Sequence, residues 1–243
     1  MKTPTNSFLV RLLDIIGPRR CVICGSRLAI SEQYLCACCN RHLPRTGFYQ
    51  SPEDNLMARM LWGRIPVKRC IALYYHEARS QAGRLVYDFK YHDAPELARM
   101  MGRMMAEECM QEQPLDEEQS SIFDGVTLLL PVPLTKQRQR KRGYNQSVEI
   151  AKGIADVTHL PIETKALRRI TFQGSQTQKG KWERNENVEG AFELVDGSRL
   201  EGQHVLIIDD VMTTGATITA CAQEILQAKD VTISVLTLCL AKS

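Results

Sequence analysis

Two adjacent carboxylates stand where a strongly apolar segment of the sequence meets a turn rich in hydroxyl groups. Asp209 and Asp210 directly follow the apolar residues 205–208. In an open α/β sheet, ligands bind outside the carboxyl ends of the strands, and these acids are expected at such an end. Ionised carboxylates accept hydrogen bonds from a vicinal diol and also bind divalent metal ions. The acid pair therefore predicts a polar ligand site.

The turn that follows the acids has the features of a phosphate site. It consists of Thr213, Thr214, Gly215, Ala216 and Thr217. A helix is expected over residues 215–228, and the first backbone N–H groups of a helix are unpaired and carry partial positive charge. A sugar phosphate would place its hydroxyl groups on the acids and its phosphate on the helix start. The structural alternative is that Asp210 caps a turn and the threonines cap the helix.

Cationic side chains crowd a second expected strand end. The apolar segment 126–133 ends at prolines, and a loop rich in Lys and Arg follows it. Such a loop can hold a group with several negative charges, such as pyrophosphate. Its candidate residues are Arg138, Arg140, Lys141 and Arg142. For a run of charges, a solvated surface loop or a nucleic-acid patch is the alternative.

A polar stretch, residues 171–181, is a candidate for a mobile loop that closes over a ligand. It has no apolar periodicity, contains Gly174 and Gly180, and lies between Arg169 and Arg184. Polar loops with glycines often act as lids over active sites.

Five of the nine cysteines fall between Cys21 and Cys39. Cys21 and Cys24 form one C-x-x-C pair, and Cys36 and Cys39 form a second, with Cys38 as an alternative fourth ligand. Two such turns are typical of a structural zinc site with four thiolate ligands. Because no secretory signal precedes them, a disulfide framework is not expected, and reduced structural cysteines are the alternative.

Net charge and hydropathy exclude few classes of protein. Residues 1–60 hold eight Lys and Arg against four Asp and Glu, or +4, and the remainder holds 23 against 24, or −1. Four thiolates with one zinc ion would lower the charge of the N-terminal part to about +2. No segment reaches the roughly 18 apolar residues of a membrane span, and residues 8–16 predict a short amphipathic helix rather than a signal peptide. We therefore expect a cytoplasmic protein without membrane insertion.

Strands and helices alternate from about residue 65 onward. Strands are expected at residues 69–75, 126–133, 163–169, 204–209 and 231–240, and helices at 80–90, 94–113, 145–157 and 215–228. Near-continuous apolar strands separated by helices predict a parallel sheet covered on both faces. We expect two domains, an N-terminal helix with a four-cysteine zinc module over residues 1–60 and an α/β domain over residues 61–243.

The segment VLIIDDVMTTGAT, residues 205–217, resembles the ribose-phosphate motif of type I phosphoribosyltransferases. Members of that family bind phosphoribosyl pyrophosphate (PRPP) with Mg²⁺. The resemblance implies that Asp209 and Asp210 hold the ribose 2- and 3-hydroxyl groups and that residues 213–217 hold the 5-phosphate.

Residues 128–147 and 167–192 are similar to the ComF/GntX family, and the likeness covers nearly the whole chain. That family joins a zinc-binding N-terminal module to a type I phosphoribosyltransferase-like parallel sheet flanked by helices. Gln176, Thr177 and Arg184 fall on polar positions of its pattern, in a loop that closes over PRPP in related enzymes. The implied chemistry is displacement of pyrophosphate at ribose C1, with an acceptor that the residues do not indicate.

The same resemblance supports a second hypothesis. ComF proteins are associated with competence, so this chain is also a candidate for handling single-stranded DNA with DNA-uptake proteins in natural transformation. PRPP would then be a regulatory ligand, or the site would be inactive. The basic N-terminal part and the basic loop fit DNA, but single-strand binders add stacking aromatic residues, which are few here.

Overall fold

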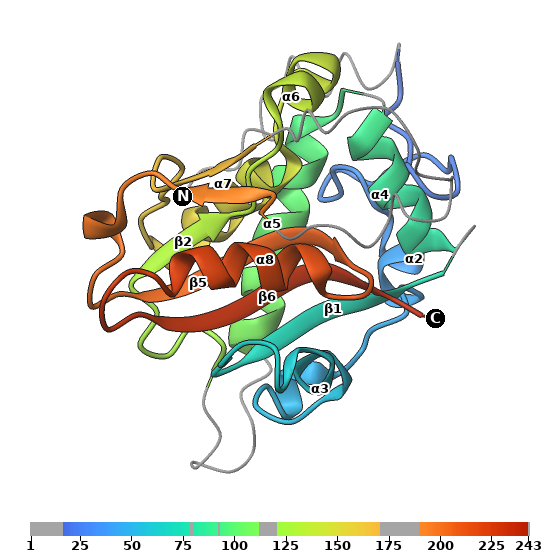
Figure 1. Ribbon diagram of the computed structural model, residues 1–243. Coiled ribbons are helices and arrows are strands. Elements are labelled where there is room, and N and C mark those ends of the chain that lie inside the picture. The colour runs from blue at the N-terminus through green and yellow to red at the C-terminus, as the bar shows by residue number, and fades with distance from the viewer. Residues whose placement is uncertain (1–16, 78–79, 92, 112–120, 171–189, 243) are drawn as a thin grey trace, which may run out of the picture.

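The computed structural model describes residues 17–77, 80–91, 93–111, 121–170 and 190–242 (Figure 1). The helix expected at residues 8–16 lies outside the described residues, as do Gln176, Thr177 and Arg184 of the expected closing loop. Within the described residues, no helix has the length and apolar character needed to cross a membrane.

Four parallel strands form the central sheet in the order β1-β6-β5-β2. These strands are β1 (Cys70–His76), β6 (Thr232–Ala241), β5 (His204–Met212) and β2 (Leu128–Pro131). Strand β6 is the last in the chain but pairs with both β1 and β5. Most residues of β5 and β6 are buried, as expected for strands covered on both faces.

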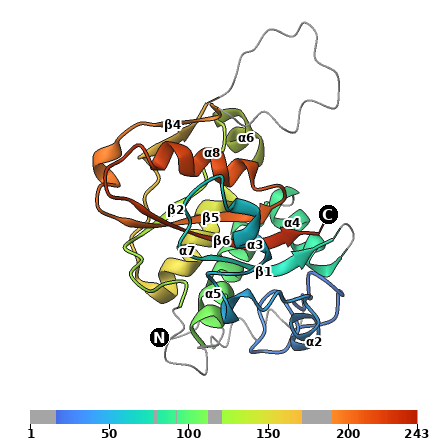
Figure 2. The same cartoon turned by 60° about the horizontal axis from the view of Figure 1, so that its bottom comes forward.

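Helices cover both faces of this sheet, as the sequence predicts. Helix α8 (Ala216–Ile225) lies on one face, and α5 (Pro95–Gln111) and α7 (Gln146–Thr158) lie on the other (Figures 1 and 2). Helices α5 and α7 cross very closely at two glycines. A Cβ atom on Gly102 would lie 2.1 Å from the carbonyl oxygen of Ile150, and one on Gly153 would lie 1.9 Å from that of Arg99.

The strand predicted over residues 163–169 touches the parallel sheet only at its start, where Ile162 forms an isolated parallel bridge with Leu129 of β2 and Glu163 N donates to the Leu129 carbonyl at 2.9 Å. Its last residues form β3 (Leu167–Arg169), which pairs antiparallel with β4 (Phe192–Leu194) in a separate two-stranded sheet. Hydrophobic pattern identifies a strand but does not specify its partner, because a three-residue strand pairs with whichever edge the chain brings to it.

The N-terminal part of the described chain is attached to the free edge of β1. After the short helix α2 (Ala37–Arg41), Arg45 forms an antiparallel bridge with Tyr74. Tyr75 N donates to the carbonyl of Pro44 at 2.8 Å, and Arg45 Nε lies 2.8 Å from Glu108 Oε1 of α5. The chain then forms the 3₁₀ helix η2 (Phe48–Gln50) and α3 (Leu56–Leu61), which packs against β1.

Candidate functional site

Asp209 and Asp210 extend beyond the end of the neighbouring strand. Strand β2 ends at Pro131, which pairs with Ile208, whereas β6 continues to pair with β5 as far as Met212. The strand predicted to end at Asp209 therefore runs three residues further, because β6 still supports it on one side. Both acids lie at the carboxyl end of the sheet, as predicted.

Side chains from two helices hold the acids in place. Ser147 Oγ donates to Asp209 Oδ1 at 3.0 Å, and Gln146 Nε2 donates to Asp210 Oδ2 at 3.2 Å. Both donors belong to the first turn of α7. Lys90, from α4 (Gln81–Tyr91), places Nζ 2.9 Å from Asp210 Oδ2. The carboxylate of Asp210 thus bonds to side chains rather than capping a turn.

The two carboxyl groups differ in their surroundings. Burial, together with the adjacent charge of Asp210, raises the pKa of Asp209 to about 7. The backbone N–H of Asp210 and the hydroxyl of Ser147 oppose this rise by hydrogen bonding to the ionised form. A bound diol or cation would add further contacts to that form, so it would favour loss of the Asp209 proton.

The turn after β5 leaves its helix start open. Gly215 is the N-cap of α8 at φ +80°, and no side chain caps the helix there. Thr213 and Thr214 are exposed, and Thr214 Oγ1 accepts a long hydrogen bond of 3.4 Å from Ala216 N, so one N–H group at the helix start already has a side-chain partner. The carbonyl of Thr214 accepts a 2.8 Å hydrogen bond from Arg64 Nη1. This arrangement presents backbone N–H groups and the α8 dipole beside the acid pair, which suits a phosphate.

The basic segment is a helix, so the prediction of a loop is wrong. Helix α6 (Lys136–Arg142) begins where Thr135 Oγ1 accepts a 3.2 Å bond from Arg138 N, and it ends at Gly143 with φ +85°. Lys, Arg and Gln all favour helix, so an N-cap and a C-terminal glycine are enough to form one.

This helix separates the basic residues that were expected to bind one ligand. Residues two positions apart on a helix point to nearly opposite sides, as Arg138 and Arg140 do. Arg140 lines a hollow of about 440 Å³ with Lys136, Gln139 and Gly143.

Arg138 instead lies near Arg169 of β3. Burial, and then the positive charge of Arg138, lower the pKa of Arg169, and Asp209 opposes this effect. The guanidinium of Arg169 also stacks over the Phe192 ring, 5.1 Å from its centre. Among the predicted cationic residues, Arg169 is thus close enough to Asp209 to feel its charge, and Arg138 lies next to Arg169.

Sequence reasoning missed several side chains of this site. Lys90, Ser147 and Gln146 contact the acids, and Arg64 contacts the turn. The sequence Asn145-Gln146-Ser147 does signal a helix start near a strand end, because Asn145 is a good N-cap residue. Lys90 and Arg64 carry no local signal, since each reaches the site from a distant part of the chain.

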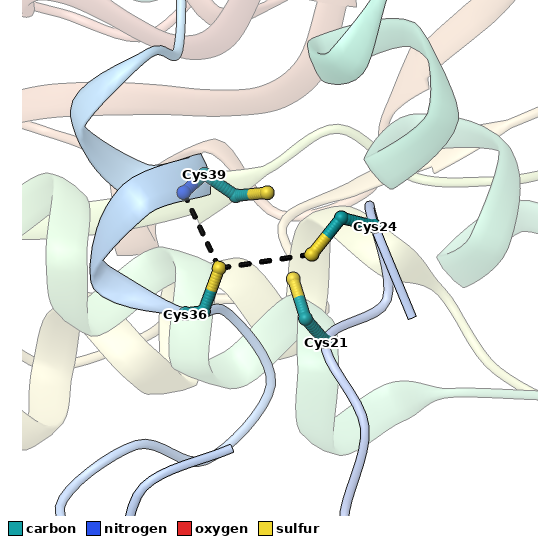
Figure 3. Close-up of side chains that lie close together, drawn as sticks. All are labelled: Cys21, Cys24, Cys36 and Cys39. Carbon is teal, nitrogen blue, oxygen red and sulfur yellow. Dashed lines mark hydrogen bonds between the residues drawn. The ribbon is translucent and has the colours of Figure 1, made fainter. Parts of the chain in front are cut away.

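The four cysteines of the two C-x-x-C pairs converge in space (Figure 3). The Sγ atoms of Cys21, Cys24, Cys36 and Cys39 all lie within 4.8 Å of one another. Cys24 Sγ and Cys36 Sγ are 3.8 Å apart, close to the ~3.8 Å edge of a tetrahedron with Zn–S bonds of about 2.3 Å. Cys38 is exposed, and its Sγ lies 3.8 Å from His42 Nδ1. The geometry thus favours Cys39 over Cys38 as the fourth ligand.

The thiols of this cluster differ in how readily they lose a proton. Hydrogen bonds from Ser26 lower the pKa of Cys24 to about 6, whereas burial and neighbouring thiols raise the pKa of Cys39. Four thiolates this close would repel one another strongly. A divalent ion would offset that repulsion, so the donor set is compatible with structural zinc.

Comparisons with known proteins agree with this geometry. A family model described as "Phosphoribosyl transferase domain" matches residues 130–243, which include the acid pair and the turn before α8. The DNA utilization protein YhgH of Escherichia coli O157:H7 is 25% identical over 230 residues, covering 91% of this chain and 97% of that protein. Competence protein F of Haemophilus influenzae is 25% identical over 211 residues, covering 82% and 87%.

One solved structure with a local likeness is the glutamine PRPP amidotransferase of B. subtilis complexed with ADP and GMP. It aligns with a TM-score of 0.38 and 19% identity, over 62% of this chain and 30% of that chain.

Proposed function

Because this chain belongs to the ComF family of phosphoribosyltransferase-domain proteins, we propose that it binds PRPP with Mg²⁺ at the carboxyl end of β5. The observation that carries the proposal is the meeting of two carboxylates and an open helix start at one strand end. Few ligands other than a sugar phosphate satisfy both, because carboxylates beside a phosphate repel it unless hydroxyl groups or a cation lie between them.

Each part of the site has a role in this proposal. Asp209 and Asp210 accept hydrogen bonds from the ribose 2- and 3-hydroxyl groups, and residues 213–217 bind the 5-phosphate. Arg138 and Arg169 bind the pyrophosphate. Lys90 releases Asp210 when the diol arrives and is then free to pair with the pyrophosphate. Residues 171–181, which include Gln176 and Thr177 and lie between Arg169 and Arg184, are proposed to close over the bound PRPP.

The proposed reaction is transfer of the phosphoribosyl group to an acceptor. The bond between ribose C1 and the pyrophosphate oxygen breaks, the bond from C1 to the acceptor forms, and pyrophosphate leaves with the electron pair. Arg138 and Arg169 would stabilise the negative charge on the leaving group. Bound Mg²⁺ would supply further neutralisation of that charge. The chemical class of the acceptor is not assigned by these residues.

Calorimetric titration of Mg²⁺–PRPP into the zinc-loaded protein tests this proposal. We expect binding by the wild type and its loss in the double variant Asp209→Asn/Asp210→Asn. Asp230→Asn is a suitable control, because Asp230 is exposed at the opposite end of the sheet and its backbone, at φ 55°, suits asparagine. Equal binding by the wild type and the double variant would refute the site, and no binding by the wild type would refute the function.

Two metal ions enter the proposal in different ways. Mg²⁺ is expected only with PRPP. Zinc is proposed as a permanent structural ion on Cys21, Cys24, Cys36 and Cys39, where four sulfur ligands leave no open position for catalysis.

The names of two relatives suggest a process in which the site acts. One relative is named for DNA utilization and the other for competence, so we propose that this chain handles single-stranded DNA with DNA-uptake proteins. The exposed cationic face of α6 favours this role. Binding of single-stranded DNA should weaken steeply with salt, with and without Mg²⁺–PRPP. No affinity at low salt would remove this second function.

A further inference from the structure

Leu61 at the end of α3 and Arg64 just after it both contact the turn before α8. Arg64 Nη1 donates to the carbonyl of Thr214 at 2.8 Å. Leu61 packs against the next residue so closely that a Cβ atom on Gly215 would lie 3.0 Å from Leu61 Cδ2. Both contacts come from a segment that precedes β1, well before residues 130–243, which match the phosphoribosyl transferase model.

The Arg64 contact fixes the direction of a backbone N–H group. A trans peptide is planar, so its carbonyl and its N–H point in opposite directions. With the Thr214 carbonyl turned toward Arg64, the N–H of Gly215 points away from Arg64. Gly215 tolerates several backbone conformations, so without this contact the peptide would be free to rotate and the N–H would lose its fixed direction.

Arg64 is itself held by a rigid support. Asn55 caps α3 by accepting a 3.1 Å bond from Ala58 N, and its Nδ2 donates to the carbonyl of Cys70 in β1 at 2.8 Å. Met57 and Leu61 are completely buried. The backbone just before Arg64 is therefore anchored to the sheet, and the exposed Arg64 side chain reaches the turn from that fixed point.

We propose that Arg64 is a positioning residue for the 5-phosphate of the ligand. It orients the peptide between Thr214 and Gly215 so that the Gly215 N–H is directed into the phosphate site before the ligand arrives. Arg64 acts through the backbone and does not touch the phosphate. This inference rests on the proposed function, because the turn has a phosphate to bind only if the site binds a ribose phosphate.

Three probes separate this role from a general effect of charge. Mg²⁺–PRPP and ribose 5-phosphate both carry the 5-phosphate, whereas pyrophosphate does not. In Arg64→Ala we expect about tenfold weaker binding of the first two and unchanged binding of pyrophosphate, since one hydrogen bond from a charged donor contributes about that much. Arg64→Lys should recover part of the loss, because an ammonium group can also donate to the Thr214 carbonyl.

Arg59→Ala is the matched control. Arg59 is an exposed arginine of α3 whose guanidinium pairs with Asp54 at 2.7 Å, so its removal takes away the same charge without touching the turn. We expect no change with any probe. Thermal unfolding of each variant shows that it is folded at the titration temperature.

The outcomes distinguish the two proposals. Suppose that the wild type binds PRPP. If Arg64→Ala then binds all three probes as tightly as the wild type, or loses the same factor of affinity for all three, the Arg64 role is wrong and the PRPP site stands. If wild type binds neither PRPP nor ribose 5-phosphate, the proposed function fails and the Arg64 role fails with it.

Discussion

At the scale of single residues, Asp209 keeps its proton at pH values where an ordinary aspartate has lost it. Its pKa of about 7 follows from burial beside Asp210. An unfolded chain would ionise the same group near pH 4. Above that pH, the raised pKa of Asp209 lowers the free energy of unfolding. The loss grows with pH until Asp209 ionises in the folded protein as well.

Replacing this carboxyl should stabilise the protein at high pH. In Asp209→Asn the amide oxygen can still accept the bonds from Ser147 Oγ and Asp210 N, but it never carries a charge. A carboxyl pKa that is about 4 in the unfolded chain and about 7 in the folded one does not change the free energy of unfolding below pH 4. It lowers that free energy by a constant, maximal amount above pH 7. The melting temperature of the variant relative to the wild type should therefore rise between pH 5 and pH 8, by about 4–12 °C for roughly 2–3 kcal/mol.

Differential scanning calorimetry at several pH values, without ligand, checks this expectation. A difference in melting temperature that stays flat from pH 5 to pH 8 would show that Asp209 has an ordinary pKa. The result would leave its proposed contact with a diol untouched, because the measurement uses the free protein.

Local motifs show which residue types do the chemistry but not which distant residues support them. The acids and the hydroxyl-rich turn lie within one short segment, so a reader of the sequence finds them together. Lys90 and Arg64 are ordinary basic residues in their own segments, and the Arg64 contact spans 150 positions of the chain. Only the packing of α3 and α4 against the sheet brings them to the site.

At the scale of elements, the basic segment shows a prediction that local signals could have corrected. Thr135 before the segment and Gly143 after it are good helix-capping residues, yet the density of charge suggested a loop. The strand at residues 167–169 shows the opposite case. Its sequence pattern indicates a strand, but its antiparallel partner, residues 192–194, lies beyond a long polar stretch and carries no signal of pairing.

The crossing of α5 and α7 depends on the absence of side chains. Gly102→Ala should destabilise the protein by roughly 2–3 kcal/mol, because its Cβ would overlap the backbone of Ile150 and the helices would have to separate. We expect the melting temperature to fall by about 4–12 °C.

Gly197→Ala provides the control for this prediction. The nearest atom to its added Cβ is a side-chain carbon of Leu194 at 3.2 Å, which can move. We expect a change below about 1 kcal/mol. Equal effects of the two substitutions would mean that the helices are not in close contact at Gly102.

The cysteine cluster allows a comparison between two neighbouring residues. Cys39→Ser should lower the zinc content below one ion per chain and reduce stability by at least about 2 kcal/mol, because one of the four converging sulfur ligands is lost. Cys38→Ser should retain about one zinc ion per chain, since Cys38 lies outside the cluster.

Metal analysis by mass spectrometry and thermal unfolding with and without a chelator measure both effects. Zinc loss in Cys38→Ser with retention in Cys39→Ser would reverse the ligand assignment. Full stability of the wild type after complete removal of metal would argue against a structural ion.

At the scale of the whole molecule, the sequence predicts the class of fold but not its spatial order. Alternating strands and helices correctly indicate a parallel sheet with helices on both faces. The position of β6 between β1 and β5 is a long-range property that hydrophobic pattern does not contain. The predicted boundary after residue 60 falls inside α3. Asn55, on the N-terminal side of that boundary, donates to the carbonyl of Cys70 in β1, so the two predicted parts are in direct contact.

The central place of β6 has a consequence for biosynthesis. A ribosome releases β1, β2 and β5 before it releases β6, because β6 follows them in the chain. Until then the edges of β1 and β5 that β6 will occupy carry unpaired backbone groups between apolar side chains. Such edges pair readily with other chains. The sheet of a nascent chain therefore stays open at its centre until residues 232–241 emerge, and the acid pair at the end of β5 has no supporting strand on that side before then.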